Sequence, residues 1–153
     1  MTLNQALITV LAGTVGTCGF SLLFRINKKH VAFATIGGFI TCVVYVICYR
    51  HIDDVFFQNF IPALVATAYS EVMARVTKSP ATPYIICSII ALVPGGKLYY
   101  TMYYFVSGSY PEFRVTVLET LKIAAGIAVG IIIISVIIHQ INYSKFKQIY
   151  DVD

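Results

Sequence analysis

The residues most able to bind a small solute are Pro94, Gly95, Gly96 and Lys97, which interrupt an apolar segment at about residues 83–106. Proline lacks a backbone donor and clashes with the preceding helical turn, and two glycines lower helix propensity further. In hydrocarbon, the backbone groups freed by such a break must be satisfied within protein or in a wet cavity. If a helix restarts after Gly96, its N-terminal amides and Lys97 place positive charge at one point, which suits a carboxylate.

We therefore predict that these four residues bind substrate near the centre of the bilayer, where transporters place broken helices. A lysine at that depth is costly and usually functional. The alternative is a kink made for packing, with Lys97 paired to a carboxylate of a partner.

Four tyrosines follow the break, at positions 99, 100, 103 and 104. Tyr103 and Tyr104 approach the outer surface, where tyrosine is enriched for interfacial reasons. Tyr99 and Tyr100 lie too deep for that interpretation, so we predict that they contribute to the substrate site.

Glu71 and Arg75 are four residues apart, with the glutamate first, which is the favourable order on a helix. One interpretation is an interfacial ion pair that ends the helix. The other is a gating or ion-coupling carboxylate with its counter-ion. The sequence leaves open whether Glu71 or Glu119 takes up a proton during transport.

Other chemistry finds little support in the residue pattern. His30, His51 and His139 sit near the ends of apolar segments without metal-ligand spacing, and the four cysteines form no CxxC pair. No nucleophile can be paired with a base, and no GxxxxGK[ST] nucleotide-binding loop occurs. We expect no cofactor, no metal and no enzyme activity, with transport driven by a gradient or a partner.

The elements that must position these residues are membrane spans. The chain has 153 residues, of which 58% are hydrophobic and only 12% charged, whereas a soluble domain carries about 25% charged residues. This composition predicts an all-α integral membrane protein with one membrane domain over residues 1–153. Spans of about 20 residues are expected at about 3–24, 31–49, 55–74, 83–106 and 115–138, followed by a polar tail at 139–153.

The basic residues predict the orientation of these five spans. With five spans, the first loop, the third loop and the tail share a side, and that side holds Arg25, Lys28, Lys29, Arg75, Lys78, Lys145 and Lys147. The opposite side holds Arg50 and Arg114. Positive charge marks the cytoplasmic side, so the N-terminus is expected outside and the C-terminus in the cytoplasm of a cell that carries the chain in its inner or plasma membrane. The net charge of +4 is thus a topogenic signal and predicts no nucleic-acid partner. Because an odd number of spans is typical of one half of an inverted-repeat transporter, we expect a second half on another chain.

Two groups of motifs resemble the C-terminal membrane module of the threonine/serine exporter family, over roughly residues 10–138. The first group surrounds the break: Ser70-Glu71-Val72-Met73-Ala74-Arg75, Lys78, Pro80, Pro83, Ile90-Ala91-Leu92-Val93-Pro94-Gly95-Gly96, Tyr99 and Met102. The second group lies in the first two spans: Gly16-Thr17-Cys18-Gly19-Phe20-Ser21-Leu22-Leu23-Phe24 and Gly37-Gly38. A lysine at position 97 is not general in that family, and Ser70 stands where glycine is more usual.

The resemblance implies a function. In that family the module is fused behind a larger one, with a soluble region and its own membrane helices, or stands as a separate small subunit. This chain resembles the small subunit, which implies a larger membrane subunit as partner and a small amino acid, threonine or serine, as substrate. A related two-component system exports succinate, so a dicarboxylate is the alternative substrate. The alternative role is a scaffold or assembly subunit that does not itself transport, and self-association into a higher-order oligomer stays open.

Overall fold

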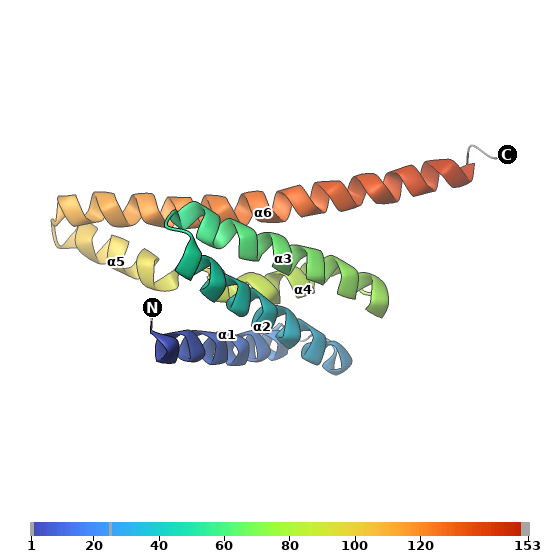
Figure 1. Ribbon diagram of the computed structural model, residues 1–153, viewed down its shortest axis with the longest axis horizontal. Helices are drawn as coiled ribbons and strands as arrows, with labels where there is room; N and C mark the ends of the chain where they lie inside the picture. The colour runs from blue at the N-terminus through green and yellow to red at the C-terminus, as the bar shows by residue number, and fades with distance from the viewer. Residues whose placement is uncertain (1, 25, 151–153) are drawn as a thin grey trace.

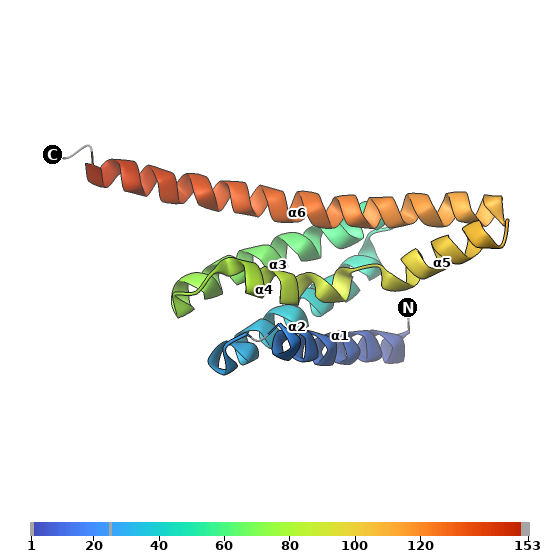
Figure 2. The ribbon, with the colours of Figure 1, turned by 180° about the vertical axis from the view of Figure 1, so that it is seen from behind.

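The computed structural model describes residues 2–24 and 26–150, with the side chains of residues 28, 29 and 142–150 outside that description. The described residues form helices and connecting turns, without strands. In chain order the elements are α1 (Leu3–Leu23), α2 (Lys28–His51), α3 (Val55–Thr77), α4 (Ala81–Ile89), a 3₁₀ turn η1 (Ile90–Leu92), α5 (Gly95–Val106) and α6 (Tyr110–Tyr150). Figure 1 shows α1, α2, α3 and α6 in this order across the molecule, and Figure 2 shows α4 against α2 and α3 on the opposite face, with α5 leading from it to the start of α6.

Three of these helices are long and apolar enough to cross a membrane: residues 3–23, 30–51 and 110–141. The two segments Ala81–Leu92 and Gly95–Val106 are together long and apolar enough to cross a membrane, although they are bent by 55° at the break. They give a fourth span if the two segments form a single broken span. The all-helical prediction is therefore confirmed, together with a break in the predicted fourth span. The prediction of five spans in one half of an inverted repeat is not confirmed, because α3 does not reach the same apolarity.

The composition of α3 follows from its place in the bundle. It packs against α2, α4 and α6, and its first turn is capped by Asp54, whose carboxylate accepts hydrogen bonds from the amides of Phe56 and Phe57. Several of its buried residues are polar: Gln58, Asn59, Thr67 and Ser70. The Thr67 and Ser70 hydroxyls donate to backbone carbonyls four residues earlier, which satisfies them inside the bundle. A helix surrounded by protein can hold such residues, and they lower its mean hydropathy.

The last helix is longer than the sequence predicts. Residues 110–114, which fall between the predicted fourth and fifth spans, belong to α6, and so do residues 139–150 of the expected polar tail. Pro111 and Glu112 lie in the first turn of α6. A proline is tolerated in the first helical turn, and a glutamate there is favoured by the helix dipole. The turn before α6 is confined to residues 107–109.

Glycines allow the closest helix contacts. A Cβ added to Gly38 of α2 would lie 2.2 Å from the Thr17 hydroxyl of α1. A Cβ on Gly126 of α6 would lie 2.6 Å from the backbone oxygen of Phe56 in α3. These helices therefore pack at a separation that a side chain would prevent, as small residues do in membrane bundles.

The connections gather at two ends of the molecule, as Figures 1 and 2 show from opposite sides. The α1–α2 connection, the α3–α4 connection and the C-terminal end of α6 lie at one end. The start of α1 and the α2–α3 and α5–α6 connections lie toward the other. This arrangement brings the predicted basic loops together, while the side of the cell that they face stays a prediction.

Candidate functional site

The chain changes direction where α4 gives way to α5. The helix tightens into η1, Val93 is extended, and Pro94 adopts φ −81° and ψ 57°. The Gly95 amide donates to the Val93 carbonyl at 2.8 Å, which makes an inverse γ-turn about Pro94. α5 then begins without a side-chain cap, and its first helical hydrogen bond runs from the Leu98 amide to the Pro94 carbonyl at 2.9 Å. The break predicted from Pro94-Gly95-Gly96 is present.

The N-terminus of α5 faces open space. Ideal Cβ atoms on Gly95 and Gly96 would meet no atom within 4 Å. Among the described residues, no acceptor takes the amide hydrogens of Gly96 and Lys97. Because the first amides of a helix carry partial positive charge, this terminus can accept the oxygen atoms of an anion.

A cavity of about 660 Å³ surrounds this terminus, within the usual range for small-molecule sites. Its wall contains residues 91–97, together with Gln5 and Thr9 of α1, Tyr45 and Tyr49 of α2, Asn59 of α3 and Ile123 of α6. A second hollow of about 480 Å³ adjoins it and shares Tyr45, Tyr49, Asn59, Lys97 and Ile123. It adds Asp53, Gln58 and Glu119 to the wall. We refer to the two hollows together as the break pocket.

Lys97 forms an ion pair with Glu119 of α6. The pair is half-exposed, with side-chain exposures of 48% for Lys97 and 33% for Glu119. The Thr101 and Thr120 hydroxyls lie 3.4 Å apart one turn further along, so α5 and α6 are joined by two polar contacts. Lys97 thus pairs within the chain itself, and the pair forms part of the pocket wall.

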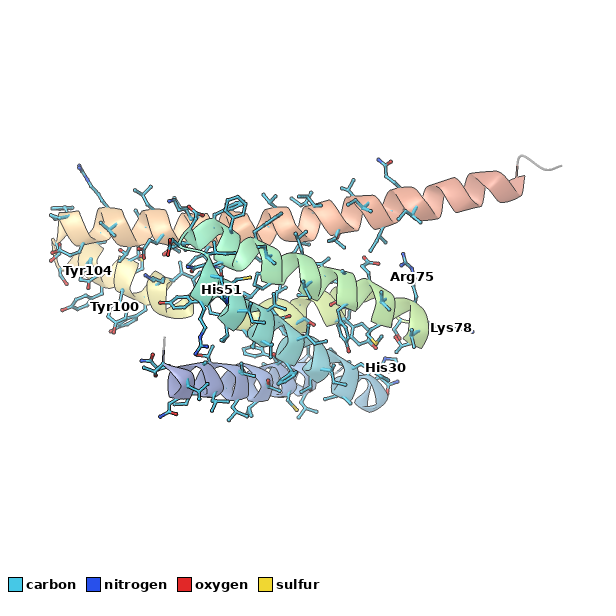
Figure 3. All side chains as sticks on the ribbon, in the orientation of Figure 1. His30, His51, Arg75, Lys78, Tyr100 and Tyr104 are labelled. Atoms are coloured by element: carbon cyan, nitrogen blue, oxygen red, sulfur yellow. The ribbon has the colours of Figure 1, made fainter. Side chains whose placement is uncertain are left out.

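The other predicted site residues lie elsewhere. Tyr99 and Tyr100 are 66% and 53% exposed, their rings contact each other edge to face, and neither lines the break pocket. Glu71 and Arg75 lie near the other end of α3, and Figure 3 shows Arg75 far from Tyr100. The structure therefore brings Pro94, Gly95, Gly96 and Lys97 together and leaves the remaining four outside the pocket.

Sequence reasoning missed most of the polar wall. The packing of α2 and α3 brings three residues of this wall to the break: Tyr45, Tyr49 and Asn59. The sequence around each of them gives no sign of this position. Glu119 had a usable signal: Lys97 lies eleven positions before Gly108 and Glu119 eleven positions after it. In an antiparallel helix hairpin with a short turn, such residues face each other.

The level of the break within the helix bundle is set by the neighbouring helices, while its depth in a membrane stays a prediction. The pocket wall uses residues near the start of α1 and α3 and near the end of α2. The break is therefore level with one end of the α1–α3 bundle, not with its middle. Counting residues along α4 alone could not show this, because α5 and the start of α6 continue beyond that bundle (Figure 2).

Comparison with known proteins places the chain in a family. No curated protein and no solved structure gives a significant match to the chain. The family described as "Threonine/Serine exporter, ThrE" matches residues 9–137, which include the break, Glu119 and most of the wall of the break pocket. The chain therefore belongs to the threonine/serine exporter family.

Proposed function

We propose that the chain is a small membrane subunit of a secondary exporter and that it binds the exported amino acid, threonine or serine, in the break pocket. A larger membrane subunit supplies the rest of the pathway. The observation that carries this proposal is the open N-terminus of α5, with its unpaired amides beside an ion pair. Family membership supports the transport role and the class of substrate.

A zwitterion fits the charges of the pocket. Its carboxylate can accept hydrogen bonds from the Gly96 and Lys97 amides and from the Lys97 ammonium group, while its ammonium group can donate to Glu119. The substrate then replaces one intramolecular ion pair by two contacts with opposite charges. A solute that lacks either the carboxylate or the ammonium group leaves a charged group of the pocket unpaired, so the site favours an amino acid over such a solute.

The same charges disfavour a dicarboxylate. Lys97 is balanced by Glu119, and Asp53 lines the adjoining hollow. A succinate dianion would bring two negative charges to a wall that has no excess of positive ones, and like charges repel each other. We therefore rank the dicarboxylate behind threonine and serine.

The proposed mechanism is rocking of this subunit against the larger one, which exposes the break pocket to one side of the membrane at a time. In the orientation predicted from basic residues, the N-terminus is outside the inner or plasma membrane and the C-terminus is cytoplasmic. The break pocket then lies toward the outer side, and Glu71 and Arg75 lie toward the cytoplasm, where a gating or ion-coupling role remains open to test. Tyr99 and Tyr100, exposed on α5, are available to the larger subunit.

The test is efflux of labelled threonine and serine from cells that hold this chain, the larger subunit, or both. We expect efflux only with both. Gly95→Leu should abolish it without loss of membrane insertion, because the added side chain enters open space and fills the pocket instead of striking a neighbour. Val106→Leu, at the exposed far end of the same helix, is the matched control and should transport normally. Efflux by the larger subunit alone would make this chain a scaffold, and normal efflux by Gly95→Leu would remove the pocket from the pathway.

A further inference from the structure

A second cavity, of about 610 Å³, lies at the end of the molecule opposite the break pocket. It opens between the α1–α2 and α3–α4 connections and has a largely apolar wall that includes Phe24, Ile26, Pro80, Pro83 and Ile86. Phe24 and Ile86 are 53% and 40% exposed. Apolar surface left open at the end of a membrane span can be covered by a hydrocarbon chain.

The polar side of this cavity is fixed by internal contacts. The His30 Nδ1 and Ser79 Oγ atoms lie 3.3 Å apart across the two connections. The His30 ring stacks on the buried Tyr84, with ring centroids 6.0 Å apart, and the Tyr84 hydroxyl donates to the Thr77 hydroxyl at 3.0 Å. These contacts join the two connections on the polar side of the cavity.

The two segments that form the cavity wall carry charge of one sign, and the nearest acidic residue in the sequence, Glu71, lies one helical turn before Arg75 on α3. Residues 24–30 and 75–86, which contain the whole wall, include no aspartate or glutamate. They include five basic residues: Arg25, Lys28, Lys29, Arg75 and Lys78. At the other end of the molecule, basic and acidic residues are interspersed: Lys97 pairs with Glu119, and Lys122 lies 4.0 Å from Asp54.

Lys78 adds an independent observation. It ends α3 with φ 50°, and it is the one non-glycine residue with positive φ in the described part of the chain. The Ser79 amide donates to the Ala74 carbonyl at 2.9 Å, as in a helix C-cap where glycine is the usual residue. A lysine in this conformation carries a strain that glycine would avoid.

We propose that this cavity binds one anionic phospholipid, with an acyl chain against the apolar wall and the headgroup phosphate near Lys78 at the basic end of the molecule. A soluble anion would use the charge but not the hydrocarbon surface, and a neutral lipid would use the surface but not the charge. Basic pockets between membrane helices suit anionic headgroups in this way. This site is separate from the break pocket, and the inference does not rest on the proposed export function.

The natural chain contains no tryptophan, so a single introduced one reports on its own surroundings. We would place it by Phe24→Trp in the full-length purified chain, in detergent micelles, and titrate with phosphatidylglycerol or phosphatidylcholine bearing brominated acyl chains that quench its fluorescence. Ile86→Trp is a second reporter in the same wall, in case the first variant fails to fold. Leu11→Trp, on an exposed face of α1, is the matched control outside the cavity.

We expect the cavity reporters to be quenched at lower mole fractions of phosphatidylglycerol than of phosphatidylcholine, and the Leu11→Trp reporter to show no preference. In the Phe24→Trp background, Lys78→Gly should weaken phosphatidylglycerol binding about fivefold, and Lys28→Gln with Lys29→Gln should weaken it further. Because glycine relieves the strain at position 78, the fold should be kept. Lys122→Gln, at the other end, should change nothing.

Three results would overturn the proposal. Equal quenching by the two lipids would show that the cavity does not select a lipid by its headgroup charge. Cavity reporters that behave like the Leu11→Trp control would show that only bulk lipid reaches this surface. Loss of the quenching when inorganic phosphate is added would indicate a soluble anion site.

Discussion

The structure predicts opposite effects for the same substitution at Gly126 and Gly95. At Gly126, an added methyl group would lie 2.6 Å from the Phe56 backbone oxygen and 3.3 Å from the Phe60 amide nitrogen. Backbone atoms of a helix cannot rotate away as a side chain can, so α3 and α6 must separate. At Gly95 the same methyl group meets nothing within 4 Å.

The magnitudes follow from these distances. Overpacking of a tight contact costs about 1–3 kcal/mol, and the α3–α6 interface is the most extensive between helices of the chain. We expect Gly126→Ala to lower the free energy of unfolding by about 2 kcal/mol. We expect Gly95→Ala to leave it unchanged or raise it by up to about 0.5 kcal/mol, because alanine restricts the unfolded chain.

The assay is reversible unfolding of the purified chain in mixed micelles of increasing sodium dodecyl sulfate fraction, followed by circular dichroism. Gly95→Ala is the matched control for the loss of a glycine as such. Unchanged stability of Gly126→Ala would show that α3 and α6 do not approach as closely as the structure has them. Strong destabilisation by Gly95→Ala would show that the start of α5 is packed against something, and the break pocket could not be open there.

Three further predictions concern the pocket and the bundle. Lys97→Ala should raise the threonine concentration for half-maximal efflux about tenfold. Glu119→Gln should raise this concentration for threonine more than for a carboxylate analogue that lacks the amine, and equal effects of Glu119→Gln on threonine and on the analogue would contradict recognition of both charges of a zwitterion. Tyr49→Phe should impair efflux more than Tyr100→Phe, since the first lines the pocket and the second does not; the reverse order in the same assay would favour the exposed tyrosines. Gly38→Ala should lower the folded fraction in micelles, because its methyl group would meet a threonine of α1 at 2.2 Å; a chain as stable as the natural one would contradict that contact.

Local residue chemistry predicted the break but not its surroundings. Proline and paired glycine act on their own backbone, so the interruption at Pro94 could be located without any knowledge of neighbours. The limits of α6 were harder to predict, because Pro111 is compatible both with a turn and with the first turn of a helix. Asn59 lines the pocket only because α3 packs beside the break, and this packing is a property of the assembled bundle that its own segment does not reveal.

The packing of the two half-helices explains why a break at this position suits a transporter. α4 is held by α1, α2 and α3, whereas the contacts of α5 are essentially with α6. One side of the Pro94 turn is therefore anchored in the bundle, and the other is tied to a single helix through the Lys97–Glu119 pair and the Thr101–Thr120 contact. A ligand that takes either charge from that pair loosens α5 from α6 at the place where the backbone already turns. In the proposed mechanism, substrate binding and movement of the half-helix are therefore coupled through the same two side chains, as alternating access requires.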